Sequence, residues 1–188
     1  MPARTRFTRD TVLDAAVALI RRDGMDALNA RALARELGCS TQPIFRAFSS
    51  MEELQSVILR RAVDCYNGYI QSYGRTYAEP YKGTGIAYIR FAREEPVFFK
   101  ALYMCDRHGA RVELSDDENM AFILESISKA TGFSQQKALR FHQMMWVFVH
   151  GLAVMAATGY MEYGDEEISR LVSDHYQATR AYFLAMEA

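Results

Sequence analysis

Apolar residues recur along this chain at helical spacing, and no stretch shows the alternation of an amphipathic strand. The first predicted helix starts at Thr8 or Arg9 and ends at Gly24, where glycine suits a C-cap. Further helices are predicted over residues 29–37, 40–48, 50–73, 86–94, 96–104, 115–132, 134–158 and 165–186, with loops over 75–85 and 106–113. The pattern therefore predicts an all-α protein of about nine helices.

The segment on either side of Gly38 predicts a helix-turn-helix. The helix before it places Leu33, Ala34 and Leu37 on one face, and the helix after it carries few residues able to fill a core. Two short helices joined by a turn that contains glycine form the motif whose second helix enters the DNA major groove. An ordinary helical hairpin has the same pattern, so the surrounding residues must decide between the two.

Polar residues at the predicted helix starts support these boundaries. Asn29 suits the N-cap of the second helix, and Ser40 or Thr41 that of the third. Pro43 falls in the first turn of the third helix and disfavours helical angles at the residue before it. Residues 50–53 form a capping box that opens the fourth helix, and residues 115–118 form another. Ser134 and Asp165 are predicted to cap the last two helices.

The charge is unevenly distributed along the chain. The net charge is −1, yet residues 1–50 hold eight Arg and five acidic residues, while the rest holds 14 basic and 18 acidic residues. Every cation before Lys82 is Arg, whose fork suits phosphate or guanine. Arg4, Arg6 and Arg9 are predicted to form a basic arm beside the helix-turn-helix, able to contact phosphates or the minor groove. This asymmetry indicates a basic recognition end joined to a body with another role.

Other features argue against several classes of protein. The N-terminus has no apolar segment of signal-peptide type, and residues 144–161 are interrupted by His150 and two glycines, which favours a buried helix over a membrane span. Three widely separated cysteines indicate a reduced, cytoplasmic protein. No metal site is predicted, because His142 and His150 lie too far apart along one helix, and the Cys105–His108 pair is interpreted as incidental. No cofactor is expected.

Residues 8–54 resemble the DNA-binding head of the tetracycline-repressor (TetR) family of bacterial transcription regulators. The resemblance rests on the helix that ends at Asp23-Gly24, on residues 29–34, on Gly38-Cys39-Ser40, on residues 45–48 and on residues 50–54. It implies a three-helix DNA-binding domain over residues 1–50, joined by a long helix to an effector-binding and dimerisation domain over residues 51–188. Phe45 stands where the family usually has Tyr, and Met51 where it usually has Lys; both usual residues contact phosphate.

The helix after Gly38 is the predicted recognition helix. Gln can pair with adenine and Arg with guanine, while Thr serves either base or a thymine methyl, so Thr41, Gln42 and Arg46 are expected at base edges or nearby phosphates. With the phosphate contacts and the arm included, the predicted DNA-binding residues are Arg6, Asn29, Arg31, Ser40, Thr41, Gln42, Phe45 and Arg46.

The second half also resembles one class within that family. Residues 146–151 are similar to a Trp, His and Gly pattern of its C-terminal domains, and residues 88–96 are likewise similar to that class. The resemblance implies an effector cavity, and soft Met and amphipathic Tyr suit varied organic ligands. The predicted lining comprises Tyr66, Tyr69, Phe91, Phe99, Tyr103, Met104, Met145, Trp146 and His150, each of which could equally be an ordinary core residue.

The last two predicted helices indicate a dimer. The helix over residues 134–158 is apolar nearly all round and the last carries an apolar stripe, so two copies could form a four-helix bundle. Such a dimer would space two recognition helices by about 34–36 Å and bind a palindromic operator. We expect a non-enzymatic repressor released by a small hydrophobic or aromatic effector. The alternatives are a helical small-molecule binding module or enzyme, with catalytic groups from separate helices, and an architectural DNA-binding protein without a ligand.

Overall fold

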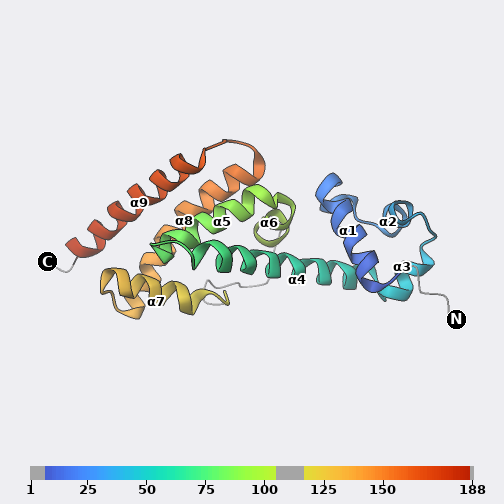
Figure 1. Cartoon of the computed structure of the whole chain (residues 1–188), viewed down its shortest axis with the longest axis horizontal. Helices are drawn as coiled ribbons and strands as arrows, with labels where there is room; N and C mark the ends of the chain where they lie inside the picture. The colour runs from blue at the N-terminus through green and yellow to red at the C-terminus, as the bar shows by residue number, and fades with distance from the viewer. Residues whose placement is uncertain (1–6, 105–116, 187–188) are drawn as a thin grey trace. The chain divides into compact units, whose positions relative to one another are not determined.

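The computed structural model describes residues 7–104 and 117–186, and these residues form helices with no strand among them (Figure 1). The α-helices are α1 (Arg9–Asp23), α2 (Ala30–Leu37), α3 (Gln42–Ala47), α4 (Met51–Tyr69), α5 (Pro80–Glu94), α6 (Pro96–Tyr103), α7 (Met120–Thr131), α8 (Gln135–Thr158) and α9 (Asp165–Ala185). A 3₁₀ turn, η1 (Met25–Ala27), follows α1, and a π-helical turn, η2 (Ile70–Gly74), extends α4. The all-helical prediction is confirmed.

The described residues form two compact units. The first, called the head below, comprises the described residues up to Asp64 together with Val97–Met104. The second, called the body, comprises Cys65–Pro96 and the described residues from 117 onward. The division falls within α4.

The head is built around the apolar faces of its short helices. Its fully buried side chains include Ile20 of α1, Leu33 of α2, Ile44 of α3 and Phe48 directly after α3. Helix α1 packs against α2, η1 and α3. The predicted helical spacing of apolar residues therefore places these side chains in one core.

Two predicted helix starts in the head are present in full. The Thr8 side chain accepts from the backbone N–H of Thr11 in a capping box, and Asn29 Oδ1 accepts from the N–H of Ala32 at 2.9 Å. Gly38 ends α2 in the left-handed conformation, with φ of +62°, which glycine adopts without strain. The turn of the helix-turn-helix is thus set by local chemistry.

The starts of α3 and α4 differ from the prediction. Thr41 occupies the N-cap of α3 but its side chain makes no capping hydrogen bond, and Gln42 is already helical despite the proline that follows it. At α4, Ser50 Oγ accepts from the N–H of Glu53 at 3.1 Å. The Glu53 carboxylate, however, accepts hydrogen bonds from the N–H and hydroxyl of Ser49 and not from the backbone N–H of Ser50. Only half of the predicted capping box therefore forms.

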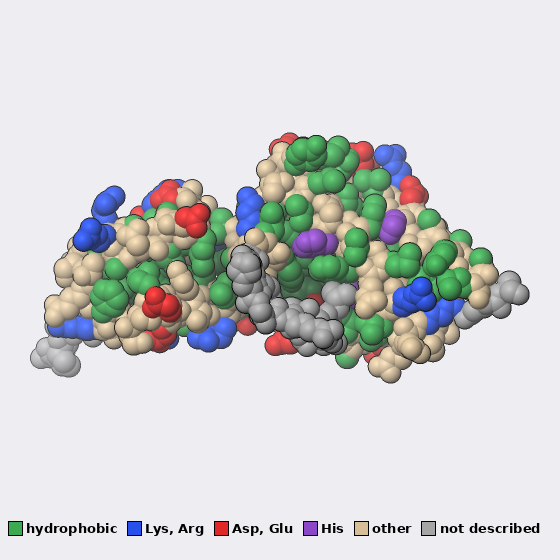
Figure 2. All heavy atoms as spheres, turned by 180° about the vertical axis from the view of Figure 1, so that it is seen from behind, with side chains coloured by type: hydrophobic (Ala, Val, Ile, Leu, Met, Phe, Trp, Pro, Cys, Tyr) green, Lys and Arg blue, Asp and Glu red, His purple; other side chains and the backbone are tan. Residues whose placement is uncertain are grey.

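The body is organised around α5, which packs against η2, α7, α8 and α9. A cluster of buried aromatic and aliphatic side chains fills the space between α7, α8 and α9: Met120, Ile123, Ile127, Phe133, Ala138, Phe141, Met145 and Phe183. Helix α8 begins as predicted, with Ser134 Oγ accepting from the N–H of Lys137 at 3.4 Å. Apolar side chains also reach the surface of this unit (Figure 2), among them Val147 at 67% exposure.

The predicted loop over residues 75–85 is right for residues 75–79, which form turns and bends, and wrong from Pro80 onward, where α5 begins. Proline is tolerated in the first turn of a helix. Gly83 lies where the body backbone approaches itself: a Cβ added there would lie 2.8 Å from Tyr77 Cβ and 3.0 Å from the carbonyl oxygen of Gly74. Glycine here permits close packing of η2 against α5 and does not mark a loop.

Two further boundaries differ. Helix α7 begins at Met120 after an Asn119 N-cap, later than predicted, because the preceding Asp117 hydrogen-bonds Asn119 and Tyr66. Gly164, not Asp165, is the N-cap of α9. The predicted loop over 106–113, the Cys105–His108 pair and the first half of the capping box at 115–118 lie outside the described residues. None of the described helices is long and apolar enough to cross a membrane.

Candidate functional site

The α3 helix presents an exposed face of mixed chemistry. Ile44 and Phe48 point into the head core, while Gln42, Phe45 and Arg46 are exposed, Phe45 at 48%. Ser40 before the helix is also exposed and Thr41 is half-buried. The α3 face therefore combines an amide, an aromatic ring and a guanidinium on a rigid helix, with its apolar side buried.

Arginines beside this face are free to meet an anion. In the described part of the chain no hydrogen bond or ion pair engages Arg31 or Arg46, and both are exposed. Unpaired guanidiniums on one short motif are suited to phosphate contacts.

Of the other predicted DNA-binding residues, one is engaged in a helix cap and one is not described. Asn29 is occupied as a helix cap, since its side chain accepts from Ala32 and donates to the carbonyl of Ala27. Arg6 lies outside the described residues.

Arg9 corrects the prediction of a basic arm. Its Nη1 donates to the Ala47 carbonyl at 2.8 Å, its Nη2 donates to Glu53 Oε1 at 2.7 Å, and its guanidinium lies 4.2 Å above the Phe48 ring. Hydrogen bonds from Ser49, with the help of Arg9, lower the pKa of Glu53 to about 2. Arg9 therefore ties the end of α3 to the start of α4 and is not a free cation.

The body contains a cavity of about 270 Å³. Its walls come from the end of α4 with η2, the start of α5, α7, α8 and α9. The lining residues are Tyr66, Ile70, Ala78, Glu79, Pro80, Tyr81, Lys82, Thr84, Gly85, Tyr88, Asp117, Ile123, Ser126, Ala130, His142, Met145, Trp146, Val149, Val172, Ser173, Tyr176 and Gln177. Five segments that are distant in sequence therefore enclose one mostly apolar space.

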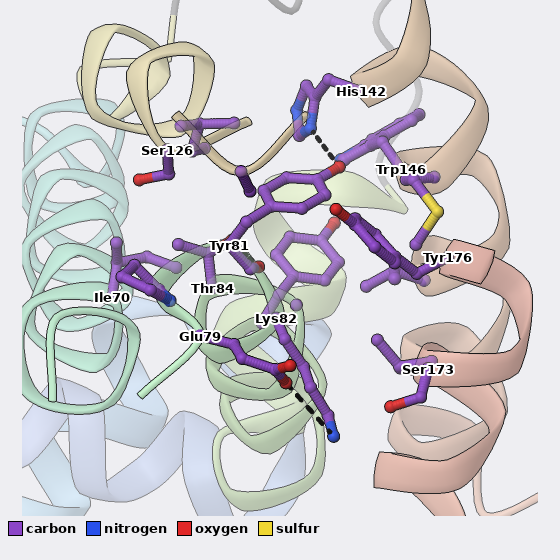
Figure 3. Close-up of a pocket in the computed structure, with 18 of the residues that line it drawn as sticks. Ile70, Glu79, Tyr81, Lys82, Thr84, Ser126, His142, Trp146, Ser173 and Tyr176 are labelled. Carbon is purple, nitrogen blue, oxygen red and sulfur yellow. Dashed lines mark hydrogen bonds and ion pairs between the residues drawn. The ribbon is translucent and has the colours of Figure 1, made fainter. Parts of the chain in front are cut away.

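One end of the cavity carries a buried hydrogen-bonded pair. Tyr81 Oη lies 3.1 Å from His142 Nδ1, and Tyr176 packs beside Tyr81 with ring centroids 6.3 Å apart (Figure 3). Burial lowers the pKa of His142 to about 4 and raises the pKa of both tyrosines. This end is therefore polar and uncharged at neutral pH.

The charged side chains of the lining have partners within the chain. Glu79 Oε2 and Lys82 Nζ lie 3.9 Å apart, away from His142 in the view of Figure 3. Asp117 accepts from Tyr66 Oη at 2.8 Å and from Asn119. Glu79 and Lys82 therefore face an opposite charge, and both oxygens of Asp117 accept hydrogen bonds from neutral groups.

A second polar group borders the cavity. Tyr88 Oη lies 2.9 Å from His150 Nδ1, and the Trp146 and His150 rings stack at 4.7 Å with an interplanar angle of 18°. Burial lowers the pKa of His150. Tyr88 and Trp146 line the cavity and His150 supports them from behind.

The structure brings together some of the predicted ligand residues and separates others. Tyr66, Met145 and Trp146 line the cavity. Three other predicted residues of the body do not line the cavity: Tyr69, Phe91 and His150. The Tyr69 hydroxyl donates to Glu94, and Phe91 is 0% exposed. Phe99, Tyr103 and Met104 belong to the head.

Met104 was predicted to point inward and this is wrong, since it is 46% exposed. It follows α6, whose inward side chains are Phe98, Phe99 and Leu102. An exposed position one residue past a short helix is outside its apolar stripe.

Tyr81 and Tyr176 line the cavity although neither is among the predicted lining residues. Tyr81 was assigned to a loop, and Tyr176 lies on a helix whose apolar stripe was attributed to dimerisation. Its position four residues after Val172, another lining residue, is the signal that could have placed it on the same face. The described residues contain no group of three or more His, Cys, Asp or Glu able to hold a metal ion.

Models of known protein families match residues in both units. Residues 12–56 match the model of the bacterial regulatory proteins of the tetR family. Residues 82–178, about half of the chain, match the model of the tetracyclin repressor-like C-terminal domain.

Individual relatives are distant. The chain is 21% identical over 160 residues to the uncharacterized HTH-type transcriptional regulator Rv0681 of Mycobacterium tuberculosis, covering 84% of this chain and 73% of that one. A TetR-like transcriptional regulator from Rhodococcus sp. RHA1 has a similar fold, with a TM-score of 0.70, 17% identity and coverage of 92% and 96%. The multidrug binding protein EbrR, solved with imidazole, superposes with a TM-score of 0.58, 13% identity and coverage of 89% and 93%. At such identities the two solved structures show a shared fold.

Proposed function

The chain belongs to the tetR family of bacterial regulatory proteins, and on this premise we propose that it is a ligand-responsive repressor that binds a palindromic operator as a homodimer. Residues 1–50 are the proposed DNA-binding domain and residues 51–188 the proposed effector-binding and dimerisation domain. A small organic effector entering the body lowers operator affinity. The protein acts in the cytoplasm, where its operator is accessible.

The observation that carries this proposal is the exposed α3 face. A short helix that only covered a core would bury its aromatic side chain, whereas Phe45 is 48% exposed beside Gln42 and Arg46, over a buried Ile44. We assign Gln42 to an adenine edge, Arg46 to a guanine edge and Phe45 to a thymine methyl. Thr41 contacts a base or phosphate.

The remaining proposed contacts are to the DNA backbone. Arg31 and Ser40 are exposed and reach phosphates. Arg6, which lies outside the described residues, is kept as a proposed backbone contact. Asn29 acts through the α2 N-terminus that it caps, where free N–H groups favour an anion.

The effector proposal rests on the body cavity and on its lining. Residues 146–151 give this body its resemblance to the Trp-His-Gly class, and Trp146 is part of the lining. EbrR, which shares the fold, is a multidrug binding protein. We propose that the effector occupies the cavity against Tyr66, Met145 and Trp146.

The dimer is proposed to form through α8 and α9. Apolar side chains on these two helices are exposed in the single chain: Met144, Val147, Tyr182 and Leu184 are 40%, 67%, 47% and 41% exposed. Packing the two helices against those of a second copy would cover them in a four-helix bundle. The two α3 helices would then lie about 34–36 Å apart, one turn of DNA.

We propose α4 as the route of coupling, because this one helix has residues in both units. An effector can shift operator affinity only by its difference in affinity for the two states of the protein. Displacement of the α4 residues that border the cavity would favour the state with lower operator affinity.

The test is operator binding by the full-length protein. A duplex from the DNA flanking the gene, chosen for its inverted repeat, is titrated in a band-shift assay against a scrambled duplex of the same composition. We expect at least a hundredfold preference for the inverted repeat at physiological salt. Equal, salt-dependent affinity for both duplexes would favour the architectural alternative, and no binding to either would favour the binding module or enzyme.

A further inference from the structure

Each ionised side chain around the body cavity is already engaged within the chain. Glu79 and Lys82 face each other, and Asp117 accepts hydrogen bonds from Tyr66 and Asn119. His142 is 7% exposed and burial holds its pKa near 4. A charged ligand would lose its hydration in this space, and it would gain a counter-ion only by displacing the partners that engage Glu79, Lys82 and Asp117, which is costly.

Neutral polar groups around the same space are unengaged. Among the described residues no hydrogen bond engages Tyr176 Oη, Ser173 Oγ or Trp146 Nε1, although all three side chains line the cavity. In Figure 3 Tyr176 points toward Tyr81, while Ser173 lies further along the same helix. A wholly apolar ligand would leave these groups without partners, which also costs free energy.

The cavity size limits the occupant. A cavity of about 150 Å³ in another protein binds benzene, and the body cavity is about 270 Å³. Its aromatic walls, which include Tyr66, Tyr88 and Trp146, favour a compact ring system over a flexible chain. An occupant of about two rings fits this space.

We infer that the body cavity takes an uncharged bicyclic molecule that carries one hydrogen-bonding group, a carbonyl or a hydroxyl, toward Tyr176 and the Tyr81–His142 pair. This inference deepens the proposed function and rests on the cavity being the effector site. It excludes organic cations and carboxylates as the preferred ligands.

The experiment compares probes of one shape and different charge. Uncharged 2-decalone, anionic decalin-2-carboxylate and cationic 2-aminodecalin are titrated at pH 7 into the full-length protein by calorimetry. The emission of Trp146, the one tryptophan of the chain, reports whether the heat comes from this cavity. We expect 2-decalone to bind at least tenfold more tightly than either charged probe and to shift the emission.

Two matched variants locate the hydrogen bond. Tyr176→Phe removes only a hydroxyl from the lining and is expected to weaken 2-decalone binding about fivefold, the usual worth of one hydrogen bond. Tyr160→Phe removes a hydroxyl from a residue that is 78% exposed and outside the lining, and it is expected to leave binding unchanged.

The outcomes separate this inference from the proposed function. A charged probe that binds as tightly as 2-decalone would overturn the inference, and so would failure of 2-decalone to bind up to its solubility limit. Tight binding of 2-decalone without release of operator DNA would support the ligand class and contradict the regulatory mechanism.

Discussion

At the scale of single residues, Arg9 connects elements that the sequence keeps apart. It lies 38 residues before the carbonyl of Ala47 and 44 residues before Glu53, and it bonds both. Because these partners lie at the end of α3 and the start of α4, Arg9 is a positioning residue for α3, the proposed recognition helix. Its guanidinium is paired with Glu53 and lies against the Phe48 ring, so it is not a free cation.

This placement predicts that substitutions of Arg9 and Arg31 change the salt dependence of operator binding differently. Arg9→Gln should lower operator affinity about tenfold without changing the slope of log affinity against log salt, because no phosphate contact is lost. Arg31→Ala, which removes a proposed phosphate contact, should reduce that slope by about one. Titrations at several salt concentrations measure both; a reduced slope for Arg9→Gln would place Arg9 on the DNA instead.

His142 predicts a pH dependence of stability. Its pKa is about 4 in the folded chain against 6.5 for an ordinary histidine, so the unfolded state binds more protons between these values. Stability should therefore fall as pH drops from about 6.5 to 4, by roughly 3 kcal/mol at about 1.4 kcal/mol per pKa unit. His142→Gln should lose this part of the dependence in urea unfolding at a series of pH values. An identical pH profile for the two proteins would contradict the burial argument.

At the scale of elements, the junction of η2 and α5 explains what local signals could not predict. Glycine and proline over residues 75–85 are the usual marks of a loop. Here Pro80 starts a helix and Gly83 permits a backbone approach that exists only in the folded body. The other helices were predictable to within a few residues at their starts, because their apolar spacing is local. Because the start of α5 was assigned to a loop, Tyr81 was not predicted to line the cavity, and one end of the cavity was therefore not predicted either.

Gly83→Ala tests this junction. The added methyl group would meet backbone at about 3 Å, so we expect a loss of about 1–3 kcal/mol in the free energy of unfolding. Gly68→Ala is the matched control, since a Cβ there meets nothing within 4 Å and should stabilise α4 by up to about 1 kcal/mol. Chemical denaturation of both variants measures the difference; equal stability would remove the packing argument.

At the scale of the whole molecule, the sequence predicted the head better than the cavity. The helix-turn-helix is contiguous, so its spacing and its glycine turn were visible along the chain. The cavity lining comes from five separate segments, and inward-facing aromatic residues at helical spacing could not be divided between core and lining. Phe91 and Tyr66 illustrate this: both are buried, their rings lie 5.7 Å apart, and only Tyr66 reaches the cavity.

The proposed dimer gives a prediction at the same scale. Val147→Glu places a charge on the most exposed apolar position of α8 and should shift sedimentation at micromolar protein from dimer toward monomer. Tyr160→Glu, which changes an even more exposed residue just beyond that helix, should leave the dimer intact. Dissociation by the control alone would place the interface elsewhere.

The central claim is that the exposed face of α3 recognises DNA sequence. Fluorescence anisotropy of the inverted-repeat duplex, with scrambled duplex as competitor, tests it through Gln42→Ala and Arg46→Ala, with Arg60→Ala as a control on an exposed residue of α4. We predict that each α3 variant loses at least tenfold in preference for the inverted repeat while the control keeps it. An unchanged preference in both α3 variants would contradict the claim.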